Sequence, residues 1–455
     1  MSENKDKRLV IKVLRETAPF ATVSGVLTTG AGMIEEIDRR IAQIGIITTK
    51  SYQVRKNLGN REPILVEAAP GCFGNAVGLR NPGMAQGAAE LSSLKSRRML
   101  RALLNVSLAG SSPEEFAELI RCFKGTADIF ELNLSCPHAE GGYGMSIGTD
   151  PKTVEKYLSH ARKETNLPIF AKLTPNTNCL KEIAKAAVAG GADGLSLINT
   201  AGPELFLEPY SKKPILRNNK DNRGGKSGAW IRETALKCVR TVRDAVGPDI
   251  PIIGMGGVST GTEAIEMRNA GADIIGLGSV FASLHPRDWE AYFESLYADL
   301  KTGTDTSFRY LDVKRRMEYA PYRVSRIERY SGGYFLLELS GSLSYRPSEF
   351  AFLWLPGAGE KPFSIAREEP LTFFIREKGE TTAAFAALAP GDIIYIRGIY
   401  GAAAPSVPDA QDGDIKRIII AAGGTGLAVA PKLAEEHFLK GTEVSVYYGG
   451  PGGEG

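Results

Sequence analysis

The sequence predicts an α/β fold: a (β/α)8 TIM barrel, then a small antiparallel β-barrel, then a partial α/β nucleotide-binding unit. Three observations support this expectation. Short β-rich runs alternate with amphipathic stretches through about residue 300, which is typical of parallel strands joined by helices. Beyond about residue 315, short strands follow one another between Gly and Pro turns, as in small antiparallel barrels. A hydrophobic strand, a glycine turn and a helix come last.

Eight β-rich runs are the candidate strands of the first barrel, and parallel strands of this number with helical crossovers close on themselves. They are Phe20–Ser24, Ile44–Lys50, Leu103–Leu108, Ile129–Cys136, Pro168–Thr174, Gly194–Thr200, Pro251–Gly257 and Ile274–Val280. The predicted crossover helices are Pro113–Phe123, Pro151–Thr165, Cys179–Ala189, Ile231–Ala245 and Gly261–Ala270. The stretch from 50 to 103 is rich in Gly, Pro and Asn, so we expect an elaborated loop over the barrel mouth.

We expect three segments: the first barrel over 1–312, a flavin-type β-barrel over 313–412, and the start of a nicotinamide-binding unit over 413–455. Two strands do not make a complete nucleotide-binding sheet, so this last unit is expected to be truncated. The strands predicted after the first barrel are Tyr322–Ile327, Tyr334–Leu339, Phe350–Pro356, Leu371–Arg376, Asp392–Arg397, Lys416–Ala422 and Glu443–Tyr448, with a helix over Ala428–Leu439.

The amino-acid composition is that of an ordinary globular protein. The 455 residues are 43% apolar and 24% charged with a net charge of +3, which argues against a dedicated nucleic-acid or membrane-surface binder. No signal-type apolar core follows the charged start, so we expect a cytoplasmic protein. The five cysteines stand singly, which favours a reducing compartment and gives no metal-site spacing. They are Cys72, Cys122, Cys136, Cys179 and Cys238.

The stretch Glu131-Leu-Asn-Leu-Ser-Cys-Pro-His138 carries the most chemical information. It begins as an apolar strand and ends at a cysteine followed by proline, where a glycine-rich loop starts. A barrel of this type keeps its chemistry at the carboxyl ends of its strands. From the residues alone, Cys136 is a base, a nucleophile or a buried small hydrophobe.

Polar residues end several other predicted strands: Lys50, Asn105, Asn133, Lys172, Asn199 and Thr200. Converging amides and ammonium groups suit a flat ligand rich in carbonyl and ring-nitrogen groups, and a buried lysine needs an anion or acceptor. Three glycine-rich segments favour a phosphorylated cofactor: the first precedes a predicted helix, and the other two end the last two strands. These segments are Gly224-Gly-Lys-Ser-Gly228, Gly254-Met-Gly-Gly257 and Gly276-Leu-Gly278.

Residues 20–285 resemble the class 1 dihydroorotate dehydrogenases, a family of FMN barrels. The matching segments are Thr49-Lys-Ser51, Gly59-Asn60, Gly74-Asn-Ala-Val-Gly-Leu-Arg-Asn-Pro-Gly83, Glu131-Leu-Asn-Leu-Ser-Cys-Pro137, Ala171-Lys-Leu-Thr-Pro175, Ile198-Asn-Thr200 and Ile253-Gly-Met-Gly-Gly257. The resemblance implies Cys136 as catalytic base. It implies that the pyrimidine substrate is bound by Lys50, Asn75, Gly78, Leu79, Asn133, His138, Asn199 and Thr200. It implies that FMN is bound by Ser24, Gly25, Lys50, Asn105, Lys172, Gly228, Gly256, Gly257, Gly278 and Ser279.

His138 departs from the commonest pattern, which has Asn after Cys-Pro. The barrel of dihydropyrimidine dehydrogenases also reads Leu-Ser-Cys-Pro-His, as do some members assigned to orotate synthesis. The position therefore leaves two substrates open, one with a carboxylate at C6 and one with hydrogen there. Imidazole can donate to a carboxylate, and a third reading makes His138 a loop residue without ligand contact.

The C-terminal part resembles the electron-transfer subunit of the class 1B enzymes, which is related to ferredoxin reductases. Glu360-Lys-Pro-Phe-Ser-Ile-Ala366 matches the flavin motif Arg-Pro-x-Ser-Ile, with lysine in place of arginine. The resemblance implies FAD contacts from Lys361, Pro362, Phe363, Ser364, Gly379, Thr381 and Thr382, and nicotinamide-nucleotide contacts from Gly423, Gly424 and Gly426. The four cysteines that usually hold a [2Fe–2S] cluster have no counterpart after Cys238, so this chain does not support that cluster.

The sequence thus predicts a two-flavin enzyme that oxidises (S)-dihydroorotate to orotate in pyrimidine synthesis and passes electrons from FMN toward FAD. NAD is an acceptor only if the full reductase domain is present. The alternatives are a dihydropyrimidine dehydrogenase-like enzyme that reduces uracil or thymine, and an electron-transfer module with a vestigial barrel. We expect a small-molecule substrate, a homo-oligomer, and no nucleic-acid, membrane or metal partner.

Overall fold

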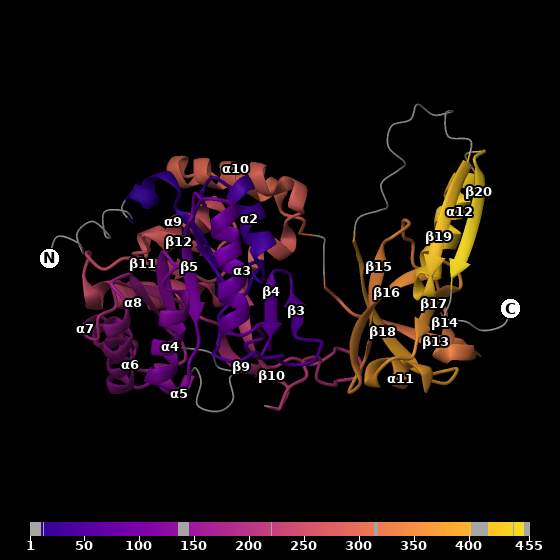
Figure 1. The fold of residues 1–455 in the computed structure, drawn as a ribbon, viewed down its shortest axis with the longest axis horizontal. Coiled ribbons are helices and arrows are strands. Elements are labelled where there is room, and N and C mark those ends of the chain that lie inside the picture. The colour runs from indigo at the N-terminus through magenta and orange to yellow at the C-terminus, as the bar shows by residue number, and fades with distance from the viewer. Residues whose placement is uncertain are drawn as a thin grey trace. The chain divides into compact units, whose positions relative to one another are not determined.

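A computed structural model describes residues 11, 13–134, 145–219, 221–313, 317–401, 417–439 and 441–449. The chain forms two compact units. The first comprises the described parts of 1–60, 64–206 and 218–315, and the second those of 61–63, 207–217 and 316–455. Figure 1 shows the two units in one view.

The first unit contains the predicted closed barrel of eight parallel strands, in the order β1-β12-β11-β8-β7-β6-β5-β2. Each strand begins within a residue of its prediction, and most end earlier because the polar residues at their ends already belong to the following loops. The strands are β1 (Phe20–Thr22), β2 (Ile44–Thr48), β5 (Leu103–Leu108), β6 (Ile129–Asn133), β7 (Ile169–Lys172), β8 (Gly194–Leu197), β11 (Ile252–Met255) and β12 (Ile274–Leu277).

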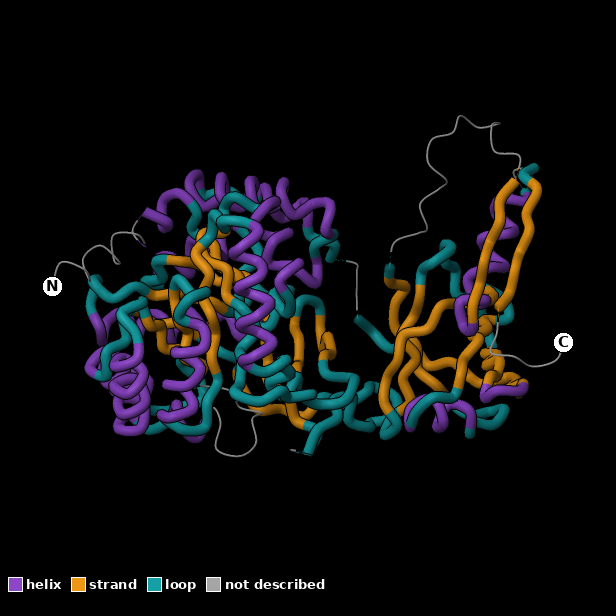
Figure 2. Tube along the Cα trace, in the orientation of Figure 1, coloured by secondary structure: helices purple, strands orange, loops and turns teal. Residues whose placement is uncertain are grey.

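Helices surround this barrel (Figures 1 and 2). The five predicted crossover helices are confirmed as α4 (Pro113–Phe123), α6 (Pro151–Glu164), α7 (Leu180–Ala189), α8 (Arg232–Val246) and α9 (Gly261–Asn269). Capping residues explain where several begin. The hydroxyl of Ser112, the carboxylate of Asp150 and the hydroxyl of Thr260 each accept a backbone N–H from the first turn. Further helices of the unit are α2 (Ala31–Arg40), α3 (Met84–Arg97), α5 (Met145–Gly148) and α10 (Trp289–Thr302).

The barrel strands bury both faces, and their alternation separates two environments. Phe130 and Leu132 of β6 pack outward in the main core against the helices, whereas Ile129 joins an inner cluster with Phe170 and Ile253. Glu131 and Asn133 alternate with the outward pair, so they share the inner face with Ile129. The barrel interior is therefore apolar toward the amino ends of the strands and polar toward their carboxyl ends.

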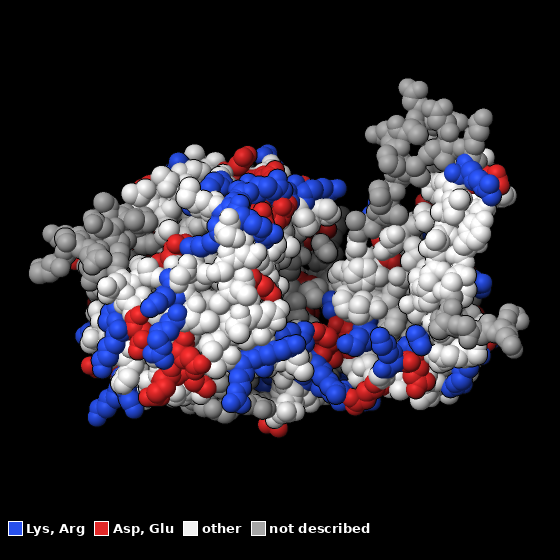
Figure 3. Space-filling view, in the orientation of Figure 1, with Lys and Arg blue, Asp and Glu red and all other residues white. Residues whose placement is uncertain are grey.

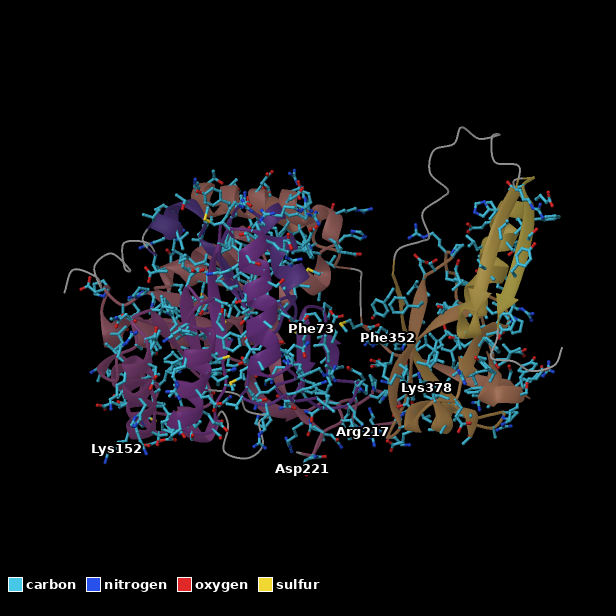
Figure 4. The ribbon with its side chains drawn as sticks, viewed as in Figure 1. Phe73, Lys152, Arg217, Asp221, Phe352 and Lys378 are labelled. Carbon is cyan, nitrogen blue, oxygen red and sulfur yellow. The ribbon has the colours of Figure 1, made fainter. Side chains whose placement is uncertain are left out.

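A separate four-stranded antiparallel sheet, β3-β4-β10-β9, accompanies the barrel. Its strands are β3 (Leu65–Ala69), β4 (Cys72–Asn75), β9 (Ala201–Leu205) and β10 (Arg223–Gly228). The stretch from 50 to 103, predicted as a loop, instead contains β3, β4 and α3. Val66 of β3 and Phe73 of β4 are buried, and Figure 4 labels Phe73. Gly74 lies against the ring of Phe206, where an added Cβ would come within 2.4 Å. Close packing of this kind explains a glycine that otherwise suggests a loop.

The second unit contains a closed six-stranded barrel in the order β13-β14-β17-β16-β15-β18. The predicted strands are confirmed as β13 (Ala320–Tyr330), β14 (Tyr334–Leu339), β15 (Phe350–Leu355), β17 (Leu371–Arg376) and β18 (Ile393–Tyr400). β16 (Gly359–Arg367) was not predicted as a strand. It contains Pro362, which removes an N–H donor and weakens a strand signal. The short helix α11 (Glu380–Ala386) follows β17.

The two-stranded parallel sheet at the end of the second unit is also confirmed, as β19 (Arg417–Gly423) and β20 (Glu443–Gly449). The predicted helix divides into the 3-10 segment η6 (Gly424–Val429) and α12 (Ala430–Phe438), which packs along the sheet. Lys432 of α12 forms an ion pair with Glu368 at 3.0 Å. The hydrogen bond to that carboxylate raises the pKa of Lys432 above its ordinary value.

Within the described ranges, no helix has both the length and the apolar character needed to cross a bilayer. Lys and Arg side chains are interspersed with Asp and Glu over the viewed face of the first unit (Figure 3). The described residues also contain no cluster of His, Cys, Asp and Glu that could hold a metal ion.

Candidate functional site

Hydroxyl and amide groups from several strands and their loops meet inside the first barrel, toward the carboxyl ends of its strands. Ser51 is the centre of this network: its Oγ lies 3.0 Å from Ser24 Oγ and 2.9 Å from Ser107 Oγ. Asn133 Nδ2 donates to Ser51 Oγ at 3.1 Å, and Asn199 Nδ2 approaches Asn133 Oδ1 at 3.3 Å. The structure therefore brings the predicted residues Ser24, Asn133 and Asn199 together. Bonds from neighbours fix the orientation of the two amides.

A buried charge pair extends this network. Ser107 Oγ donates to Glu131 Oε1 at 3.1 Å, and Lys172 Nζ lies 3.6 Å from the same oxygen. The side chains of Lys172 and Glu131 are 5% and 1% exposed. Charges removed from water in this way are costly unless they are paired and hydrogen-bonded. Lys172 is thus held inside the barrel, as its position at a strand end predicted.

Lys50 follows β2 and lies beside Gly25. The Lys50 backbone N–H donates to Thr28 O at 3.1 Å. A Cβ added to Gly25 would lie 3.0 Å from Lys50 Nζ, and Gly25 has a φ of +86°. The left-handed backbone therefore favours glycine at this position, and its missing side chain leaves room for the Lys50 ammonium group.

Asn105 of β5 is fully buried and only half satisfied. Its Nδ2 donates to Thr48 Oγ1 at 3.1 Å. Its Oδ1 finds no hydrogen-bond partner among the described residues, and neither does the buried Ser196 Oγ of β8. Buried polar atoms are nearly always paired, so these atoms indicate a ligand group or ordered water in the barrel.

The predicted phosphate-binding glycines lie where strands enter their loops. Gly228 ends β10, and Gly256 and Gly257 follow β11, all three with positive φ. A Cβ on Gly257 would lie 2.7 Å from the carbonyl oxygen of Gly228, so these two segments touch. Gly278 follows β12 and packs against Val23, and Ser279 begins the next 3-10 turn.

The remaining predicted substrate residues lie on and after β4, or after β8. Asn75 Nδ2 donates to Gly225 O at 3.2 Å, which ties β4 to β10. Gly78 and Leu79 both have positive φ, and a Cβ on Gly78 would come within 2.9 Å of the Asn60 side chain. The Thr200 backbone N–H donates to Asn199 Oδ1 at 2.9 Å.

Cys136 and His138 lie outside the described residues, so their predicted roles stay predictions. The other cysteines belong to different surroundings. Cys238 is buried on α8, where burial raises the pKa of its thiol. Cys122 is exposed on α4, and Cys179 precedes α7.

The second unit has a cavity of about 470 Å³ where the β-barrel meets the turn after β19. Tyr334 and Phe374 stack in its wall with ring centroids 5.3 Å apart. The predicted residues Pro362, Phe363, Ser364, Gly423 and Gly424 line it, together with Tyr334, Phe374, Arg376, Lys378, Thr425 and Ala428. Residues far apart in the sequence thus form one pocket, with both aromatic surface and positive charge.

Other predicted contacts lie outside this lining. Lys361 is exposed on β16, and neither it nor Gly426 lines the cavity. At the start of α11, Thr382 Oγ1 accepts the backbone N–H groups of Lys378 and Gly379 at 2.9 and 3.1 Å. Thr381 Oγ1 donates to Ala358 O at 3.1 Å. The backbone N–H of Gly379, a predicted FAD contact, therefore already has an internal acceptor.

Sequence reasoning assigned no role to Ser51, Ser107, Glu131 or Thr48. A hydroxyl within a β-rich run carries no signal of its own. For Glu131 the strand alternation predicts the orientation of the side chain. Glu131 lies two residues before Asn133 and therefore on the same face of β6.

Comparisons with known proteins identify the family of the first barrel. The model of the dihydroorotate dehydrogenase family matches residues 10–291. The chain is 40% identical over 261 residues to a "dihydroorotate dehydrogenase B (NAD(+)), catalytic subunit" of Methanothermobacter thermautotrophicus, covering 57% of this chain and 82% of that relative. A protein of the same description from Pyrococcus horikoshii is 40% identical over 268 residues, covering 58% of this chain and 83% of that relative.

A solved structure supports the fold. The crystal structure of DHODH in complex with ferulenol from Eimeria tenella superposes with a TM-score of 0.52 at 18% identity, over 66% of this chain and 85% of that one. The matched family model covers more than half of the chain and includes all eight barrel strands and the polar network. The chain therefore belongs to the dihydroorotate dehydrogenase family and is an oxidoreductase.

Proposed function

We propose that the first barrel oxidises (S)-dihydroorotate to orotate on bound FMN, in the synthesis of pyrimidines. The observation that carries this proposal is the fixed pair of amides, Asn133 and Asn199, beside the Ser51 hydroxyl network. A pyrimidine ring presents alternating carbonyl and N–H groups, which amides can match as donor and acceptor. The names of the relatives favour the same substrate.

The residues present fit FMN. Asn105 Oδ1 needs a donor, and Lys172 supplies a buried cation in the same barrel. Ser24, Gly25 and Lys50 would complete the contacts to the ring, and the glycines at the end of β10 and after β11 and β12 would receive the phosphate. When bound, FMN supplies the acceptor for the hydride that leaves C6 of the substrate.

The protein's own part is to bind, orient and deprotonate. Lys50 contributes positive charge for the substrate carboxylate, and the two amides hold the ring. We assign to Cys136 Sγ the removal of the C5 proton. A thiolate is a serviceable base because free cysteine has a pKa of about 8.5, near the working range of an enzyme.

Replacing Lys50 or Asn133 by alanine should weaken orotate binding. Each variant loses a polar contact in a desolvated pocket, at about 1–3 kcal/mol, or roughly 5- to 150-fold in Kd. Titration of the flavin absorbance with orotate measures this. Lys163→Ala and Asn269→Ala, on the exposed ends of α6 and α9, are matched controls that should bind orotate normally. Unchanged affinity in both site variants would remove them from the substrate site.

The choice of substrate is tested by turnover. Dihydroorotate should reduce the bound flavin in anaerobic stopped flow, whereas dihydrouracil should not at comparable concentrations. The reverse preference would assign the barrel to the reduction of uracil or thymine, which His138 leaves open.

We further propose that electrons pass from FMN to FAD bound in the second unit. Support comes from the cavity there, because it combines stacked aromatic rings, Ser364 and two cations. Its volume of about 470 Å³ lies in the range of ligand pockets. Arg376 and Lys378 would supply the charge for the FAD phosphates, and Arg376 rests 5.2 Å from the centroid of the Tyr334 ring.

Lys378→Ser should weaken FAD about tenfold or more, because a charge-assisted hydrogen bond contributes roughly 1.5–3 kcal/mol. Lys361→Ser removes an exposed lysine of the same β-barrel and should change the Kd by less than about twofold. Quenching of FAD fluorescence by the FMN-saturated full chain measures both. The opposite order would return the phosphate contact to Lys361, as the resemblance implies, and no quenching by the unaltered chain would reject FAD.

A further inference from the structure

Glu131 is a buried carboxylate for which the proposed reaction has no direct use. It lies in the middle of β6, facing the barrel interior, with a side chain 1% exposed. Its neighbours on that face are Ile129, which is apolar, and Asn133, which belongs to the amide pair. Glu131 is therefore placed between the apolar core of the barrel and the proposed flavin site.

Two contacts define what Glu131 can do. It accepts a hydrogen bond from Ser107 at 3.1 Å, and Ser107 in turn contacts Ser51 at 2.9 Å. Its Oε1 lies 3.6 Å from Lys172 Nζ, which is too long for a direct hydrogen bond but close enough for strong Coulombic attraction in a buried site. The N–H groups of Lys172 are therefore not consumed by Glu131, while part of its charge is compensated.

We propose that Glu131 is a positioning residue that holds Lys172 in the barrel and limits the positive potential that Lys172 applies to the flavin. This inference rests on the proposed FMN site. A flavin gains negative charge on its pyrimidine side when it is reduced, so a nearby cation raises its reduction potential. A carboxylate beside that cation opposes the effect. Glu131 would thus keep the potential lower than Lys172 alone would set it.

The neutral variant Glu131→Gln tests this directly. Glutamine keeps the size of the side chain and an oxygen acceptor for Ser107, but it removes the negative charge beside Lys172. The midpoint potential of bound FMN, measured by equilibration with reference dyes, should become more positive. We expect the equilibrium constant for reduction to rise about tenfold or more, which corresponds to about 30 mV for a two-electron couple.

Asp128→Asn is the matched control. Asp128 directly precedes the same strand and is paired with Lys95 at 2.8 Å, so the variant also removes one carboxylate from a lysine pair. It lies at the opposite end of β6 from Asn133 and should leave the flavin potential unchanged. Equal shifts in the two variants would show a general effect of charge and overturn the assignment.

A double-variant cycle separates action through Lys172 from a direct field of Glu131 on the flavin. Lys172→Met should lower the potential. If Glu131 acts through Lys172, adding Glu131→Gln in that background should have little further effect. Additive shifts would overturn the positioning role, as would an unshifted potential in Glu131→Gln alone. The proposed function is judged on the unaltered chain: failure to bind FMN, or to be reduced by dihydroorotate, would reject the site itself.

Discussion

Changing Cys136 to alanine should abolish the oxidation of dihydroorotate while FMN stays bound. Loss of a general base lowers a rate by about 10²- to 10⁴-fold. The flavin contacts proposed here come from other residues, so the absorbance spectrum of FMN should remain that of the bound cofactor. Anaerobic stopped flow that follows bleaching of FMN by dihydroorotate measures the chemical step without any electron acceptor.

The other thiols of the chain provide the control. Cys122→Ala changes an exposed cysteine on α4, and in this variant dihydroorotate should reduce FMN at the normal rate. Cys136→Ser should recover a little activity at high pH, because an alcohol is a much weaker acid than a thiol. Bleaching at the normal rate in the alanine variant would mean that another group takes the C5 proton.

The barrel could be predicted from the sequence because its signals are local. Each strand is a short apolar run that begins after a turn, and Ser112, Asp150 and Thr260 mark helix starts by their side-chain chemistry. The burial of Lys172 could be predicted because a lysine that interrupts an apolar run needs a partner, which here is Glu131. These inferences require only a few neighbouring residues.

The parts that could not be predicted depend on contacts between distant residues. Gly74 indicates a turn until the ring of Phe206 is seen to occupy the space of its missing Cβ. Glu131 resembles a solvated strand residue until Lys172, on the neighbouring strand, is placed beside it. Likewise, Arg376 and Lys378 reach the cavity of the second unit only through the pairing of β17 in a closed barrel.

Glu360→Ala should strongly destabilise the β-barrel of the second unit. Glu360 is 1% exposed and binds the Arg397 guanidinium at two positions, with distances of 2.6 and 2.7 Å. Tyr319 also donates to it, because burial and the nearby carboxylate raise the pKa of the Tyr319 hydroxyl well above its ordinary value. Removing the acid leaves Arg397 buried and uncompensated, at a cost of about 3–5 kcal/mol in the free energy of unfolding.

Denaturant unfolding followed by Trp354 fluorescence measures this loss. Trp354 lies in the β-barrel and is 1% exposed. The chain has three tryptophans, so replacing the other two by Trp230→Phe and Trp289→Phe leaves Trp354 as the only tryptophan, and its fluorescence then reports unfolding of the second unit. Glu328→Ala, which removes the partly exposed partner of Arg326 from the same barrel, should cost less than about 1 kcal/mol.

A double replacement of the buried pair tests the cause. Glu360→Leu combined with Arg397→Met removes both charges at similar volume, and it should cost far less than Glu360→Ala alone. An equal loss in the double variant would mean that the pair stabilises the barrel by its own attraction. A small loss would show that the cost in the single variant comes from the orphaned Arg397 charge, which packs 4.3 Å from the centroid of the Phe352 ring.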